Sequence, residues 1–190
     1  MQITLFTNIL ILLVIWGAQL KLRSFLLKKI KLILTTAILA PAITLLGYSY
    51  ILYGIWLNSP PPIRYFLPPH SPISYYFFTI GRRFWISYFI ALLIALIFLL
   101  LMQSIKKERR GLIFEKEEPY LICAALVLVG HPFWIIYLLF SILIYLIFSF
   151  AAKGKRISLY YLWMPIAILI LALSPLLNNI EALSQVKLYL

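Results

Sequence analysis

The sequence predicts an all-α fold, a polytopic integral membrane bundle of about six transmembrane helices. Hydrophobic residues make up 64% of the 190 positions and charged residues only 12%, whereas charged residues are about a quarter of a soluble domain. The mean hydropathy is +1.02. Because a spanning helix needs about 20 apolar residues, this length allows several spans without a sizeable soluble domain. We therefore expect a single transmembrane domain over residues 1–190.

The distribution of basic residues predicts the orientation. The chain has 17 Lys and Arg against 5 acidic residues, a net charge of +12. In a soluble protein such a charge would suggest nucleic acid, but in a membrane protein Lys and Arg collect in cytoplasmic loops. We expect no nucleic-acid partner, a multi-pass location in the plasma membrane, and both termini outside (N-out/C-out).

The first span is predicted over residues 2–20. No basic residue precedes it and positive charges follow it, which indicates a retained helix and not a secretory signal. The basic connection over residues 21–31 is interpreted as a cytoplasmic anchor. Apolar residues at helical spacing within it also allow it to lie on the membrane surface. There it would contact anionic lipid through Lys21, Arg23, Lys28, Lys29 and Lys31.

The second span, residues 32–57, contains Pro41, which we expect to kink it. Its far end is rich in Tyr and Trp, as is typical of a membrane–water interface. The following extracytoplasmic loop, residues 58–84, holds six of the 11 prolines. We expect a non-helical segment that caps the bundle, or alternatively binds an extracytoplasmic partner, with His70 an ordinary loop residue.

A third span, residues 85–102, leads into a charged cytoplasmic loop over residues 104–119. The apolar region that follows has 34 residues, about 50 Å as one helix and too long for a core of about 30 Å. Two crossings also keep the basic residues 153–156 on the cytoplasmic side. We therefore expect an extracytoplasmic turn at His131-Pro132 and three further spans, at residues 117–130, 133–152 and 159–177.

The charged loop is where polar chemistry is expected. It holds four of the 5 acidic residues: Glu108, Glu115, Glu117 and Glu118. A structural interpretation is that the last three begin a helix near Pro119, where negative charge complements the helix dipole. Alternatively, two carboxylates in one site share a proton and activate water. The candidate catalytic residues are then Glu115, Glu117 and Glu118.

Other kinds of chemistry have little support. The predicted spans carry no Asp, Glu, Lys or Arg at their centres, which argues against a proton-coupled transporter. Cys123 is the only cysteine, so neither an internal disulfide nor a Cys-based zinc site is possible. His131 is interpreted as a turn residue. No Gly-rich phosphate loop is present, and we expect no cofactor and no metal.

The layout of the second half carries a family resemblance. From Gly111 the order is an acidic run ending in Glu-Glu-Pro-Tyr-Leu, a short apolar helix, Gly130-His-Pro, a longer helix, Lys153-Gly-Lys-Arg-Ile-Ser and a Pro-bearing last span. This resembles the type IV prepilin peptidases, in which a Gly-x-Gly-Asp motif opens a short helix that ends in a Gly-aromatic-Pro turn. The resemblance implies a membrane aspartyl-type peptidase scaffold.

The chain departs from this family at the catalytic residues. The family uses two aspartates from separate spans, and this sequence contains no Asp. Three functions remain open. The first is a non-catalytic, degenerate relative whose charged loop binds a membrane protein partner or lipid. The second is a protease that uses Glu carboxylates. The third is a small transport or lipid-handling subunit.

Overall fold

The computed structural model describes residues 2–104, 115–151 and 160–177, and its regular structure in these ranges is helical. Three of the helices, α1, α2 and α4, are long and apolar enough to cross a membrane, and α6, α7 and α8 are shorter apolar helices. The seven α-helices of the described ranges are α1 (Gln2–Lys21), α2 (Arg23–Leu57), α3 (Ile73–Ile80), α4 (Ile86–Ser104), α6 (Glu118–Val129), α7 (Phe133–Ala151) and α8 (Trp163–Leu177).

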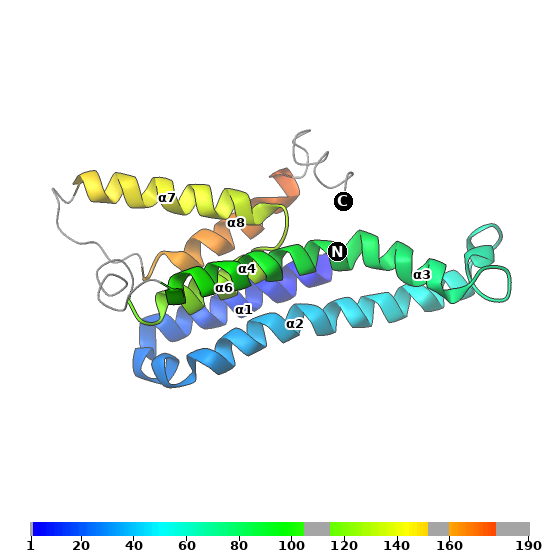
Figure 1. The fold of residues 1–190 in the computed structure, drawn as a ribbon, viewed down its shortest axis with the longest axis horizontal. Coiled ribbons are helices and arrows are strands. Elements are labelled where there is room, and N and C mark those ends of the chain that lie inside the picture. The colour runs from blue at the N-terminus through cyan, green and yellow to red at the C-terminus, as the bar shows by residue number, and fades with distance from the viewer. Residues whose placement is uncertain (1, 105–114, 152–159, 178–190) are drawn as a thin grey trace.

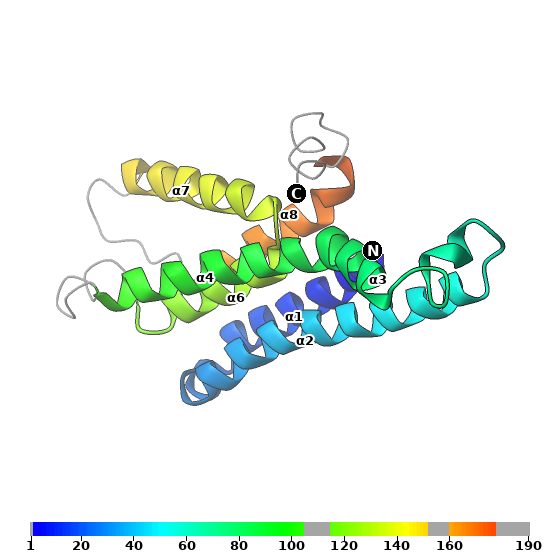
Figure 2. The ribbon, with the colours of Figure 1, turned by 45° about the vertical axis from the view of Figure 1, so that its right-hand side comes forward.

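The short helix α6 lies at the centre of the bundle (Figures 1 and 2). It packs against α1, α2, α4, α7 and α8. Of its 12 residues, only Tyr120 is not buried. A helix that is apolar on every side must be enclosed, either by lipid or by other helices, and here the neighbouring helices enclose it.

The long helices alternate in direction, so chain segments that are distant in sequence meet at one end of the bundle (Figure 1). The end of α1, the start of α2, the end of α4 and the starts of α6 and α8 all lie there. Figure 2 shows the same grouping from a second direction. This end carries the basic residues of α1 and α2 and the described glutamates.

The second helix begins earlier than predicted. Only Leu22 separates α1 from α2, and α2 runs unbroken for 35 residues from Arg23 through Pro41. The predicted basic connection over residues 21–31, with its apolar residues at helical spacing, is therefore part of α2 from Arg23 onward, and the second helix does not begin at residue 32. The lysines alternate with Leu, Phe and Ile, and no Gly or Pro interrupts them, so nothing in this stretch ends a helix.

The predicted non-helical loop over residues 58–84 is correct only in its first half. Asn58 to Pro72 contains a single 3₁₀ turn, Ile63–Phe66, but α3 starts at Ile73 and continues through a π-helical turn, Gly81–Trp85, into α4. The aromatic residues of α3 pack on α2: the Tyr76 ring lies 5.3 Å from those of both Tyr53 and Trp56. The helical structure therefore resumes as soon as the prolines end.

The predicted break between the fourth and fifth helices is confirmed. α6 ends at Val129, Gly130 has φ +75°, and α7 starts at Phe133. The Trp134 N–H donates to the Gly130 carbonyl at 2.9 Å, which closes the turn. The last helix begins at Trp163, later than the predicted residue 159. The predictions for residues 105–114 and 152–159, including Glu108, fall outside the described residues.

Candidate functional site

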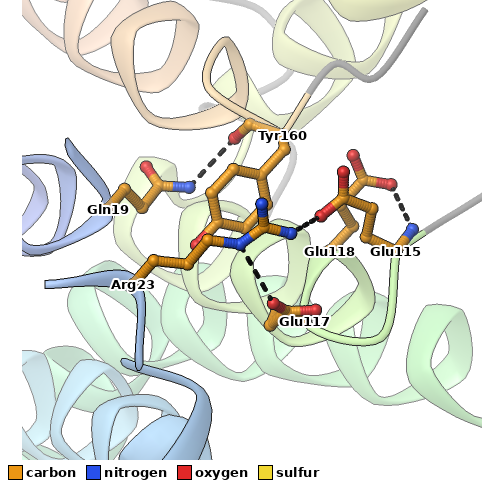
Figure 3. A network of polar contacts seen from close by, with 6 residues as sticks. All are labelled: Gln19, Arg23, Glu115, Glu117, Glu118 and Tyr160. Carbon is orange, nitrogen blue, oxygen red and sulfur yellow. Dashed lines mark hydrogen bonds and ion pairs between the residues drawn. The ribbon is translucent and has the colours of Figure 1, made fainter. Parts of the chain in front are cut away.

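Six polar residues meet at the end of the bundle where α1, α6 and α8 come together (Figure 3). They come from the hairpin of α1 and α2, from the segment that leads into α6, and from the segment that leads into α8. We call this group the Arg23 cluster. Its members are Gln19, Arg23, Glu115, Glu117, Glu118 and Tyr160.

Arg23 is the centre of the cluster, and the one-residue turn at Leu22 places it there. Its Nη2 donates to a carboxylate oxygen of Glu115, and its Nε lies 3.7 Å from Oε1 of Glu117. The guanidinium carbon also lies 4.9 Å from the ring centroid of Tyr160, a cation–π contact. The Arg23 side chain is 48% exposed, whereas that of Glu117 is only 5% exposed.

Glu118 shapes the start of α6. It is 2% exposed, and its Oε2 accepts a hydrogen bond of 2.9 Å from the backbone N–H of Glu115. The Glu118 N–H in turn donates to the Glu115 carbonyl at 3.3 Å. These bonds close the segment on itself, with negative charge and Pro119 in the first turn, as the helix dipole favours. A helix does begin at these glutamates, as the sequence predicted.

Gln19 and Tyr160 join α1 to the segment before α8. The buried Gln19 donates from Nε2 to the Tyr160 carbonyl at 2.9 Å. Burial, with the added negative charge of Glu117, raises the pKa of the Tyr160 phenol to about 12. The phenol is therefore protonated at neutral pH, and it presents its ring face to Arg23.

The structure brings the three candidate catalytic residues together. Glu115 and Glu117 share Arg23, so the positive guanidinium offsets two neighbouring negative charges. This arrangement suits a structural ion pair between the α2 start and the α6 start. A carboxyl dyad that shares a proton has a different requirement, since its two carboxyls must lie within about 3 Å of each other. The catalytic role of these glutamates stays a prediction.

The described residues contain no group of three or more His, Cys, Asp or Glu side chains that could hold a metal ion. Cys123 is buried in α6, and its Sγ donates to the Ala95 carbonyl of α4 at 3.2 Å. It is a small packing residue between α6 and α4. His131 lies at the opposite end of α6 from the glutamates, as predicted, and its Nδ1 accepts from the Trp134 indole at 3.2 Å.

Gln19 and Tyr160 were not predicted as members of a site, and Arg23 was predicted only as a lipid contact. The sequence offered one signal for Gln19, because this amide lies at the end of the first apolar stretch, two residues before Lys21. Nothing in the sequence marks Tyr160, which is one of 13 tyrosines.

Comparisons with protein-family models, with curated proteins and with solved structures found no match. The resemblance to the type IV prepilin peptidases therefore stays a prediction. By length and composition, several apolar helices suggest a multi-pass membrane protein.

Proposed function

We propose that this chain is a six-span plasma-membrane protein, N-out/C-out, with a degenerate prepilin-peptidase-like scaffold and no peptidase activity. Its cytoplasmic end binds the headgroups of anionic lipids. The observation that carries this proposal is the position of Arg23 between Glu115 and Glu117. The ion pairs engage two of the three candidate catalytic carboxylates, and they leave the neighbouring lysines for lipid.

The alternating direction of the helices supports six crossings (Figure 1). Lys21, Arg23 and Lys116 lie at the same end, with the start of α6 and the end of α4. By the positive-inside rule that end is cytoplasmic. The short helix α6 is almost entirely buried among the other helices, so it does not need the full length of a lipid-exposed span, and seven of the 15 residues of α8 are buried as well.

The lysines near the α1–α2 turn support lipid binding. Lys21, Lys28, Lys29 and Lys31 are all exposed, and the ion pairs at this end of the described chain involve Arg23 instead. The lysines of α2 point in different directions around the helix, because residues 28, 29 and 31 are separated by steps of about 100°. They form a positive collar where the helix meets the headgroups.

The lipid proposal is tested by native mass spectrometry of the purified chain with an anionic phospholipid and with a zwitterionic one. Each lysine near the surface contributes about 1 kcal/mol, so Lys28→Gln should weaken anionic lipid binding about fivefold. Arg64→Gln is the matched control, since it removes one exposed charge at the opposite end of α2. Equal losses for both variants would refute a lipid site at the collar.

A glutamate protease is the second candidate, and the burial of Glu117 and Glu118 favours it, with 4% and 2% exposure. Catalytic carboxylates are commonly shielded from water in this way. Membranes containing the chain are incubated with a prepilin-like peptide, and we expect no cleavage. Cleavage by the parent chain that Glu118→Gln abolishes without loss of expression would establish the protease and overturn the proposal of a non-catalytic protein.

A further inference from the structure

We infer that the turn between α6 and α7 lies inside the hydrocarbon layer, and that Asn8 and His131 beside it form a polar site that water enters from the outer surface. This goes beyond the cytoplasmic function proposed above and uses only its placement of the helices in the membrane. It also changes the predicted location of His131, which the sequence placed in an extracytoplasmic turn.

The length of α1 gives the depth of this turn. α1 has 20 residues, a length of about 30 Å that matches the hydrocarbon core, with Lys21 at the inner boundary. Asn8 lies six residues after Gln2, about 9 Å inside the outer boundary. Its Nδ2 donates to the Leu128 carbonyl at 2.8 Å. The last turn of α6 is therefore at the depth of Asn8.

Helix α4 gives an independent measure of the same depth. The contact between Cys123 and Ala95 sets these two residues at one level. Leu128 lies five residues after Cys123. Because α4 and α6 run in opposite directions (Figure 1), the residue of α4 at the level of Leu128 is Ile90, five residues before Ala95. Arg82, the nearest described charge beyond it, is a further eight residues away, about 12 Å. Both measures place the turn about 10 Å short of the outer boundary.

Non-helical backbone is tolerated at membrane depth only where it is buried in protein or lines a water-filled space. Pro132 in the turn is buried and Gly130 and His131 are partly buried, and internal hydrogen bonds pair backbone groups of the turn. The Gly130 N–H donates to the Leu126 carbonyl at 3.0 Å, and the Trp134 N–H donates to the Gly130 carbonyl at 2.9 Å. The Trp134 indole also donates to Nδ1 of His131. This bond leaves a neutral His131 with its proton on Nε2, as a hydrogen-bond donor.

Asn8 indicates that water is present. Its Nδ2 is bonded to Leu128, but its Oδ1 is buried and accepts no hydrogen bond from the described residues. A buried amide oxygen without a partner is destabilising, and an ordered water commonly supplies the missing hydrogen bond. The outer boundary is about 9 Å away and the inner one about 20 Å, so the shorter route for water is from outside.

The first two turns of α1 have apolar residues on one face, which would contact lipid, and polar residues on the opposite face. Phe6 and Leu10 are 77% and 57% exposed and face outward. Thr4, Thr7 and Asn8 are less exposed and, at spacings of three and four residues, share the other face of the helix. The polar residues of the first two turns of α1 are therefore gathered above the α6–α7 turn.

The test uses single cysteines in a Cys123→Ala background, labelled from outside intact cells. His131→Cys probes the turn and Arg64→Cys, in an exposed extracytoplasmic turn, is the positive control. We expect a small hydrophilic methanethiosulfonate to label both positions. A bulky membrane-impermeant maleimide should label residue 64 to completion while residue 131 stays unlabelled. Thr7→Cys, which leaves the turn intact, should behave like His131→Cys and serves if that variant does not accumulate.

Two results would overturn the inference. Labelling of residue 131 by the bulky maleimide as fast as residue 64 would place the turn at the outer surface. Labelling of residues 7 and 131 only by a lipid-soluble maleimide would place the turn in the hydrocarbon without access for water.

Discussion

Arg23 connects segments that are distant in the sequence, because the turn between α1 and α2 places its guanidinium beside them. Its guanidinium reaches two carboxylates and one aromatic ring that come from two later parts of the chain. Surface ion pairs contribute about 0–1 kcal/mol, whereas breaking a buried pair costs about 3–5 kcal/mol. This pair is intermediate, because Arg23 is half exposed and Glu117 is nearly buried.

Arg23→Gln should lower the free energy of unfolding by about 1–2 kcal/mol, because it leaves the buried Glu117 without its counter-charge. Unfolding by sodium dodecyl sulfate in mixed micelles measures this loss. Lys29→Gln, an exposed position on the same helix, should change the free energy much less. The double variant Arg23→Gln/Glu117→Gln should be less destabilised than the sum of its two single variants. Additive losses would show that the two residues do not interact.

Tyr160 predicts a dependence on alkaline pH. Its pKa is raised from 10 to about 12 in the folded chain, so the unfolded chain loses the proton first as the pH rises. The stabilisation is complete below pH 10 and is lost between pH 10 and about 12. Tyr160→Phe should remove this part of the alkaline loss, measured by unfolding at a series of pH values. An unchanged pH profile would contradict the assignment.

The glutamates were predictable as the start of a helix because the relevant chemistry is local: acidic residues beside a proline at a helix start. The contacts of the other residues in the Arg23 cluster were not predictable from the sequence. The bond from Gln19 to Tyr160 joins residues 141 positions apart, and no local pattern encodes such a contact. Arg23 was interpreted from the basic stretch in which it lies, whereas its partner Glu115 is 92 residues away in the sequence.

At the scale of elements, α6 is the helix on which the others pack. Leu126 is fully buried, and Leu126→Ala should cost about 2–5 kcal/mol of unfolding free energy through lost contacts and a cavity. Leu139→Ala makes the same chemical change on α7, where the side chain is 63% exposed, and should cost less than about 1 kcal/mol. The measurement is detergent unfolding of both variants. Equal losses would contradict a central position for α6.

Element boundaries were predicted well where a backbone signal marks them and poorly elsewhere. Gly130 and Pro132 fix the end of α6 and the start of α7 to within a residue or two. The start of α2 was placed at residue 32 because the basic residues before it were interpreted as a connection between spans, although lysine is a good helix former. The start of α3 was missed because its aromatic residues gain their helical conformation from packing on α2, a contact between distant segments.

At the scale of the whole molecule, the hydrophobic interior has two parts. The larger surrounds α6, and the smaller, around Leu67, Tyr76 and Ile80, lies where α2 and α3 extend past the rest of the bundle (Figure 1). α2 has 35 residues, about 52 Å, well beyond a hydrocarbon core of about 30 Å. The smaller cluster therefore stabilises a projection that the membrane does not support.

Leu67→Ala should loosen this projection without unfolding the bundle, because Leu67 is fully buried in the smaller cluster. Limited proteolysis of the purified chain should show faster cleavage between Asn58 and Pro72, while the midpoint of detergent unfolding stays unchanged. Ile63→Ala, at an exposed neighbouring position, is the control. A parallel fall in the unfolding midpoint would mean that the two clusters unfold together.

The shortness of α6 has a consequence for biogenesis. With 12 residues, α6 is well below the about 20 apolar residues of a span that inserts by itself. The helices α1, α2 and α4 are synthesised before it and supply three of its five packing partners. We therefore expect α6 to enter the bilayer together with α7, as a hairpin that docks onto helices already in place. The helices α1, α2 and α4 would then be translated and inserted first, and α6 would pack against them as it enters the bilayer.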